Sequence, residues 1–164
     1  MDSKAKNVKL FPKYRQISRD FLFFYTINIL FLTQVKNVSP ANIVLIDTFY
    51  SLFVVIAQVP ASFIVDKIGR RKGMILGNIL NCIYLILIIT SKNLYSLILA
   101  EITSSIGFSL KDIAEPAILN ESIDLQKEEK SKKFARIQAK AISGYYFFAA
   151  ISIAISGFLF EINP

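Results

Sequence analysis

The chain has no histidine and only one cysteine, Cys82, among its 164 residues. Without histidine, the commonest ligand of zinc and haem iron is missing and an imidazole base is excluded. A lone cysteine also excludes an intrachain disulfide. We find no nucleophile–base pair, metal-ligand spacing or glycine-rich phosphate loop in the sequence. The sequence therefore predicts a protein that is not an enzyme and has no catalytic residue, metal site or cofactor.

Acidic residues are also few, with 12 Asp and Glu against 19 Lys and Arg. A nucleic-acid-binding protein would spread its basic residues over a polar face. Here they lie between apolar blocks, so nucleic acid is not an expected partner. The blocks are about 20 residues long, which is enough for a helix to cross about 30 Å of hydrocarbon. The predicted fold class is therefore an all-α membrane protein, with the lipid bilayer as its surroundings.

The apolar blocks predict five transmembrane helices. Their expected ranges are about 17–35, 41–65, 72–90, 94–119 and 141–160. A basic lead (1–16) precedes them, a charged loop or interfacial helix (120–140) separates the last two, and 161–164 form an outer end. We interpret the first apolar block as a retained helix, because no small-x-small cleavage site follows it.

The basic residues predict the orientation of these helices. The segment ending at Arg19, the turn 66–72 and the loop 120–140 hold six, four and six of the 19 Lys and Arg residues. Basic segments next to membrane helices stay in the cytoplasm. The N-terminus, the turn and the charged loop are therefore expected inside, and the C-terminus of this chain outside, in a multi-pass protein of the cell membrane.

Two local patterns predict how helices start and pack. Ser39 followed by Pro40 is typical of a helix N-cap and first helical position. Gly73 and Gly77 form a small-xxx-small pair that would let another helix approach closely.

The fourth predicted helix carries an unusual polar stripe. Its members are spaced so that they share one helix face: Glu101, Ser105, Phe108, Asp112 and Glu115. Carboxylates facing lipid would be costly, so the stripe should face the protein interior or water.

Four polar residues are candidates for a coupling or substrate path. Glu101, about 10 Å inward from the outer end of its helix at 1.5 Å per residue, is the main candidate for a proton-carrying carboxylate, against a purely structural hydrogen bond. Asp47 is a weaker candidate near the outer surface. Asn28 either bonds to a neighbouring helix or faces a polar cavity, and Asp112 suits an inner gating pair.

The charged turn resembles the loop between helices 2 and 3 of the major facilitator superfamily. The family pattern reads Gly, three residues, Asp, Arg or Lys, one residue, Gly, Arg, then Arg or Lys. Asp66, Lys67, Gly69, Arg70 and Arg71 match it, and a serine stands at the position of the first glycine. Gly69 permits the tight turn.

The sequence suggests two contacts for the turn, and the resemblance adds a third. Asp66 can accept hydrogen bonds from backbone N–H groups at the next helix start. Arg70 can pair with a carboxylate at the inner end of helix 4, for which Glu121 is the candidate. In the family, the matching Asp holds the inner side shut against the second half of the transporter.

The resemblance also implies an activity and an incomplete fold. The chain looks like the first five of the usual twelve helices, an incomplete N-terminal six-helix half, whereas the family encloses its path between two halves. The stretches 115–123 and 151–164 resemble bacterial drug exporters, although the glycine–proline signature of many antiporters is absent from 141–160, which argues against proton antiport.

Two functions are therefore expected to compete. The first is secondary active transport of a small solute, such as multidrug or metabolite efflux, with protons as a candidate coupling ion. The alternative is a non-transporting membrane subunit, or a truncated relic, that packs with a partner membrane protein. In either case a missing C-terminal half or a partner membrane protein is expected.

Overall fold

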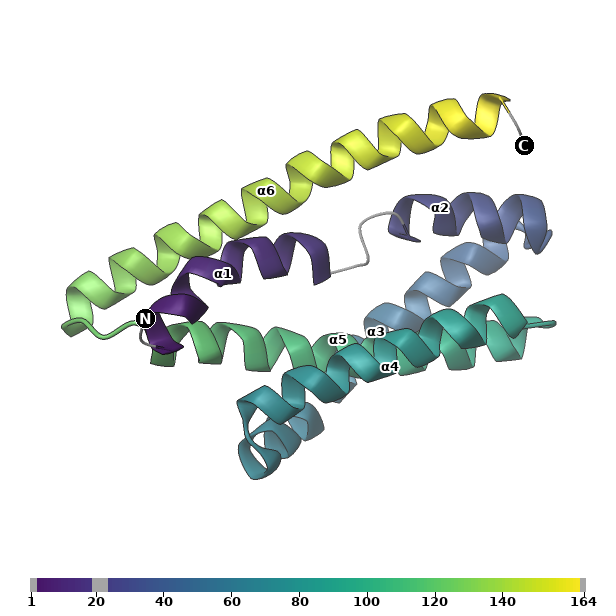
Figure 1. The fold of residues 1–164 in the computed structure, drawn as a ribbon. Coiled ribbons are helices and arrows are strands. Elements are labelled where there is room, and N and C mark those ends of the chain that lie inside the picture. The colour runs from purple at the N-terminus through teal and green to yellow at the C-terminus, as the bar shows by residue number, and fades with distance from the viewer. Residues whose placement is uncertain (1–2, 19–23, 163–164) are drawn as a thin grey trace. The chain divides into compact units, whose positions relative to one another are not determined.

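A computed structural model describes residues 3–18 and 24–162, and every regular element in these ranges is a helix (Figure 1). The elements are α1 (Ser3–Ser18), α2 (Phe24–Leu30), the π-helix η1 (Phe31–Val35), α3 (Pro40–Ile68), α4 (Arg70–Thr90), α5 (Leu94–Ser122) and α6 (Lys127–Ile162). No strand occurs in the described ranges, which agrees with the predicted all-α class.

Three of these helices are long and apolar enough to cross a membrane: α3, α4 and the 127–156 part of α6. The predicted count of five is not confirmed. Five residues of the predicted first span, 19–23, lie outside the described residues, as do 163–164 of the predicted outer end. α5 is not among the three, and it carries Glu101, Lys111, Asp112 and Glu115 within its length.

Two predicted segments have more helix than expected. The basic lead 1–16 falls largely within α1. The segment 120–140, expected as a loop or an interfacial helix, is helical from Lys127, where α6 begins. Glu128 and Glu129 in the first turn of α6 complement the helix dipole, and Lys132 pairs with Glu128 at 3.0 Å across one turn.

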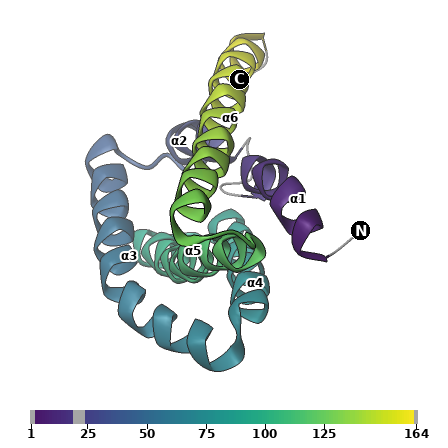
Figure 2. The ribbon, with the colours of Figure 1, turned by 90° about the vertical axis from the view of Figure 1, so that its left-hand side faces the viewer.

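The chain divides into two compact units, 36–118 and the combination of 1–35 with 119–164. In the first unit, α5 packs against both α3 and α4, as seen along the helices in Figure 2. Its core combines small and branched side chains: Ala61, Val65, Leu110 and Ala114, covered by Met74, Leu76, Leu80 and Ile113. Small residues let helix backbones approach where lipid supplies no hydrophobic drive.

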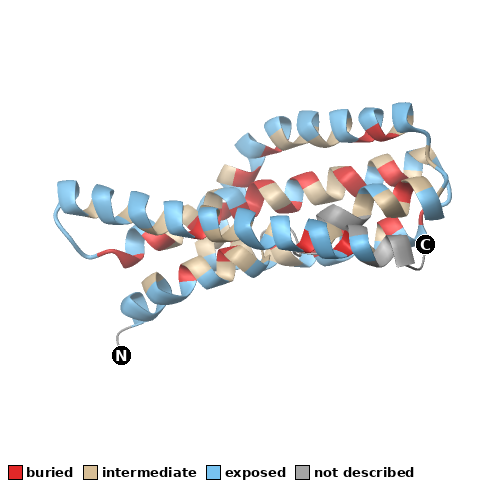
Figure 3. Cartoon of the chain, turned by 90° about the horizontal axis from the view of Figure 1, so that it is seen from above, coloured by how far each residue is buried: buried red, intermediate tan, exposed pale blue. Residues whose placement is uncertain are grey.

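α4 shows most plainly how each helix has an inner and an outer face. Its buried residues recur at helical spacing: Gly73, Gly77, Asn81, Tyr84 and Ile88. The opposite face exposes a row of isoleucines: Ile75, Ile79, Ile83 and Ile86. Figure 3 shows buried positions confined to narrow strips along the helices. Apolar side chains on an outer face suit contact with lipid.

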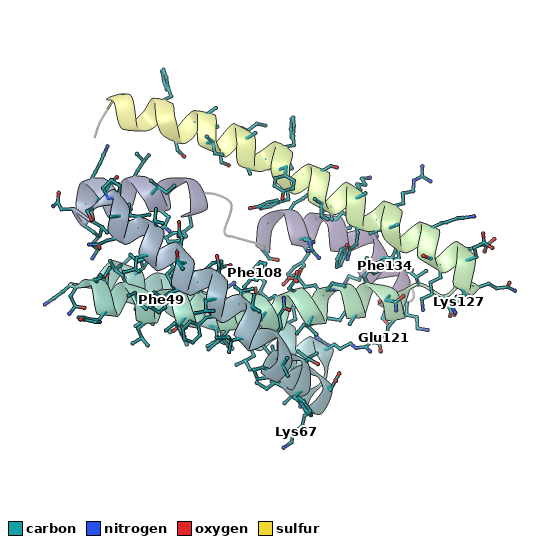
Figure 4. The ribbon with its side chains drawn as sticks, turned by 180° about the vertical axis from the view of Figure 1, so that it is seen from behind. Phe49, Lys67, Phe108, Glu121, Lys127 and Phe134 are labelled. Atoms are coloured by element: carbon teal, nitrogen blue, oxygen red, sulfur yellow. The ribbon has the colours of Figure 1, made fainter. Side chains whose placement is uncertain are left out.

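In the other unit, α1 lies along the first half of α6 (Figure 1). Phe11 of α1 packs with Ala141 of α6 and with Leu119 and Ile123, beside Phe134 and Ile137. Phe134 is on α6, next to α1, in Figure 4.

Candidate functional site

The turn between α3 and α4 consists of a single residue, Gly69. Its amide donates to the Val65 carbonyl at 2.9 Å, which ends α3, and its own carbonyl accepts from Gly73 N at 3.0 Å, which starts α4. The backbone angles are φ 91° and ψ 147°, in a region that only glycine adopts readily. Open space surrounds the position where a Cβ would lie. Backbone geometry, not crowding, therefore requires glycine here.

Arg70, directly after the turn, reaches across to α5. Its Nη1 donates to the Ala117 carbonyl at 3.3 Å. This bond fastens the start of α4 to α5 beside Pro116, which lies inside α5. The predicted pair of Arg70 with Glu121 would join the two units of the chain and stays a prediction; Glu121 is exposed in the last turn of α5.

The other charged residues of the turn point outward. Asp66, Lys67, Arg71 and Lys72 are all exposed, and Figure 4 shows Lys67 at the tip of the hairpin. No side chain caps the start of α4, so the predicted capping bonds from Asp66 are not formed. The one-residue turn lets Gly69 itself serve as the N-cap, and the Asp66 carboxylate stays available to another surface.

Glu101 is held inside the first unit by a tyrosine on the neighbouring helix. Tyr84 Oη of α4 donates to Glu101 Oε1 of α5 at 2.9 Å. Glu101 is 6% exposed and Tyr84 7%. The bond supplies a polar partner to a buried carboxylate, which would be costly to bury without one. The sequence did not reveal Tyr84, because its pairing depends on the register between α4 and α5.

The polar stripe on α5 is only partly interior. Glu101, Ser105 and Glu115 are buried, but Asp112 is exposed. The reason is that Leu110 packs in the core with α3, and Asp112 lies about 200° around the helix from it.

Phe108 of the stripe and its neighbour Ser109 both contact α3. Ser109 Oγ donates to the Val54 carbonyl of α3 at 3.2 Å. Phe108 meets Tyr50 edge-on with ring centroids 6.4 Å apart, and its position on α5 is labelled in Figure 4. These contacts fix α5 against α3 about two turns from Glu101.

The remaining two candidates lie on other helices. Asp47 is exposed on α3. Asn28 is in the other unit, where its Oδ1 is buried without a hydrogen-bond partner among the described residues. No group of three or more His, Cys, Asp and Glu in the described ranges could hold a metal ion.

The backbones of α4 and α5 approach closely where the two helices cross, and the sequence indicated only the α4 side of this contact. A methyl at Gly107 would lie 2.9 Å from the Gly77 carbonyl oxygen, and one at Gly77 would lie 2.7 Å from the Gly107 carbonyl oxygen. Asn81 Oδ1, also without a hydrogen-bond partner in the described part, faces Gly107. The prediction that Gly73 and Gly77 permit close contact is confirmed, but toward different helices: Gly73 faces Val65 of α3.

Three long apolar helices, a buried tyrosine–carboxylate hydrogen bond and a charged glycine turn are together typical of a multi-pass membrane protein. The sequence model of the Major Facilitator Superfamily matches residues 18–163, so the chain belongs to this family. No curated protein and no solved structure matches the chain. Membership gives the chain a general membrane-transport role, in a family of transporters rather than enzymes.

Proposed function

We propose that the chain serves secondary active transport of a small solute, and that Glu101 is the carboxylate that couples transport to an ion. The observation that carries this proposal is the buried Tyr84–Glu101 hydrogen bond at 2.9 Å. A buried ionisable group in a membrane helix marks an ion or substrate path by default. The resemblance of 115–123 to drug exporters favours efflux of a drug or metabolite.

The chemistry of the pair suits a reversible change of charge. When Glu101 is ionised, the Tyr84 hydroxyl stabilises one carboxylate oxygen. When a proton or a cationic solute neutralises the carboxylate, this bond weakens and the contact between α4 and α5 changes with it. Because α4 also begins at the charged turn, a change in the pair would be transmitted along a single helix to Gly69 and Arg70.

The charged turn is proposed as the inner gate, on the cytoplasmic side of the cell membrane, with the N-terminus inside and the C-terminus of this chain outside. Asp66 and Arg71 are exposed, which suits contact with the second half of a transporter. Asp66→Asn should then favour an inward-open state. The measurement is thiol labelling of a cysteine placed at Ala117 in a Cys82→Ser background, and unchanged labelling would contradict this gate.

Coupling is tested by ethidium efflux from proteoliposomes of the full chain across a range of pH. Glu101→Gln should flatten the pH profile, because the side chain can no longer change its charge. Asp112→Asn is the matched control: it removes a carboxylate from the same helix, but an exposed one, and should keep the wild-type profile. A wild-type chain that moves neither ethidium nor any solute of a broader panel would rule out transport by this chain itself.

A further inference from the structure

α1 and α6 run side by side in the same direction, and their contacts fix which residues lie level. Lys4 pairs with Asp124 just before α6. Further along, Phe11 packs with Ala141, and Gln16 lies so close to Gly144 that a Cβ there would clash with it. The last turns of α1 are therefore level with 137–144 of α6.

A ring of aromatic side chains surrounds α6 directly after this level. We call Tyr145, Tyr146, Phe147 and Phe148 the aromatic collar. Four consecutive residues, about 100° apart, cover the whole circumference of a helix. Tyr146 and Phe147 are 65% and 63% exposed. Lys140 precedes the collar and no charged residue follows until Glu161. Aromatic residues at such a boundary mark the level of the membrane–water interface.

Four cations lie on the polar side of the collar within about three helical turns. We call them the basic band: Lys9 and Lys13 of α1 with Arg136 and Lys140 of α6. All four are exposed, and none has an ion pair within the described part of the chain. No ion pair of the described residues therefore neutralises this band.

The outer face of α1 combines Lys13 of the band, and Lys6 about two turns before it, with apolar side chains. Lys6, Leu10, Lys13 and Ile17 recur at helical spacing and share one face. Leu10 is 45% exposed and Ile17 66%, while the opposite face buries Phe11 and Arg15. Exposed apolar side chains between lysines are typical of a helix that contacts the headgroup layer.

We propose that the basic band binds the headgroups of anionic phospholipids at the membrane surface. The support is charge complementarity at a defined depth: the collar marks the interface, and four unneutralised cations from two helices lie directly on its polar side. Each lysine near an anionic surface contributes about 1 kcal/mol, or about fivefold in affinity. This proposal is independent of the transported solute and of Glu101.

The test measures which lipid surrounds α6. The chain has no tryptophan, so Ile151→Trp places a single fluorophore one turn beyond Phe147 on the same face. The full chain carrying this change is reconstituted in phosphatidylcholine with increasing phosphatidylglycerol, one of the two bearing brominated chains that quench tryptophan. We expect phosphatidylglycerol to be preferred by about fivefold or more, and less at high salt.

Two matched triple variants show which cations cause the preference for phosphatidylglycerol. Lys9→Gln/Lys13→Gln/Lys140→Gln removes three cations of the band and should bring the preference close to one. Lys6→Gln/Lys127→Gln/Lys133→Gln removes the same charge farther from the collar and should keep most of it. Equal quenching by both lipids in the chain with an unmodified band would overturn the proposal and favour an acidic segment of a partner protein at the band. Equal loss of the lipid preference in both triple variants would also overturn it, because the preference would then not depend on the cations of the band.

Discussion

Two glycine sites in the same unit need glycine for opposite physical reasons. At the α4–α5 crossing, Gly77 and Gly107 have ordinary helical backbones but no space for a side chain. At the α3–α4 turn, Gly69 has open space but a backbone conformation with φ 91°. The crossing therefore requires glycine for close packing of two backbones, and the turn requires glycine for its backbone conformation.

The two regions should therefore tolerate different amino-acid substitutions. At the crossing, the cost of a substitution should scale with side-chain volume and fall when a neighbour is trimmed. At the turn, the cost should depend on the preference of the new residue for positive φ and be insensitive to its neighbours. SDS-induced unfolding of the purified full chain in mixed micelles measures both kinds of cost as a change in the free energy of unfolding.

The largest effect is expected for Gly107→Ala. The new methyl would lie 2.6 Å from Asn81 Oδ1 and 2.9 Å from the Gly77 carbonyl oxygen, and the second contact is with backbone that does not rotate away. We expect the free energy of unfolding to fall by about 3 kcal/mol, at the upper end of overpacking costs.

Two further variants control the crossing prediction. Adding Asn81→Ala to Gly107→Ala should recover part of the loss, since it removes the shorter contact. Gly144→Ala should cost less, because only the flexible Gln16 side chain occupies the space there. Equal losses for Gly107→Ala and Gly144→Ala would contradict the close crossing.

A smaller loss, about 2 kcal/mol, is expected for Gly69→Ala, because alanine is strained at this φ and ψ. Gly69→Val should cost at least as much as Gly69→Ala, since a β-branched residue is a genuine outlier at positive φ. Arg71→Ala, two residues away and exposed, is the control for the turn. If Gly69→Ala cost no more than Arg71→Ala, backbone conformation would not govern this position.

The contrast between the regions also shows how far the sequence could predict the structure. The glycine turn and the Ser39 N-cap depend on a few consecutive residues, and both were predicted; Ser39 Oγ accepts from Asn42 N at 3.4 Å. Gly107 and Tyr84 act through another helix, and only the register of α4 on α5 brings them to Gly77 and Glu101.

Two other differences had signals in the sequence. The spacing of Val8, Phe11 and Arg15 gives α1 a buried face that charge counting alone overlooked. Likewise, Glu128 and Lys132 one turn apart favour a helix start within the predicted charged loop. For Asp112 the polar stripe left two environments open, the protein interior or water, and the packing of Leu110 in the core leaves Asp112 exposed.

Elsewhere between α4 and α5, Tyr84→Phe should lower the free energy of unfolding by about 1 kcal/mol, the usual net value of one hydrogen bond. The ring remains to pack, so only the bond to Glu101 is lost. In a double-mutant cycle with Glu101→Gln, the two changes should be less than additive. Full additivity would mean that the hydroxyl and the carboxylate do not interact. Phe108→Leu, which alters α5 packing without touching this bond, is the reference for non-specific loss.

The smallest effect is expected at the opposite end of α4, where a side chain rather than a glycine completes the helix. Lys36 Nζ donates to the Ile89 and Ser91 carbonyls at 2.6 and 2.7 Å. The last carbonyls of a helix lack partners within the helix, and a cation there also complements the helix dipole. Because these carbonyls can bind water or lipid headgroups instead, Lys36→Met should cost only about 0.5 kcal/mol, and Lys36→Arg less. A loss as large as that of Gly69→Ala would contradict this and show that both ends of α4 are equally constrained.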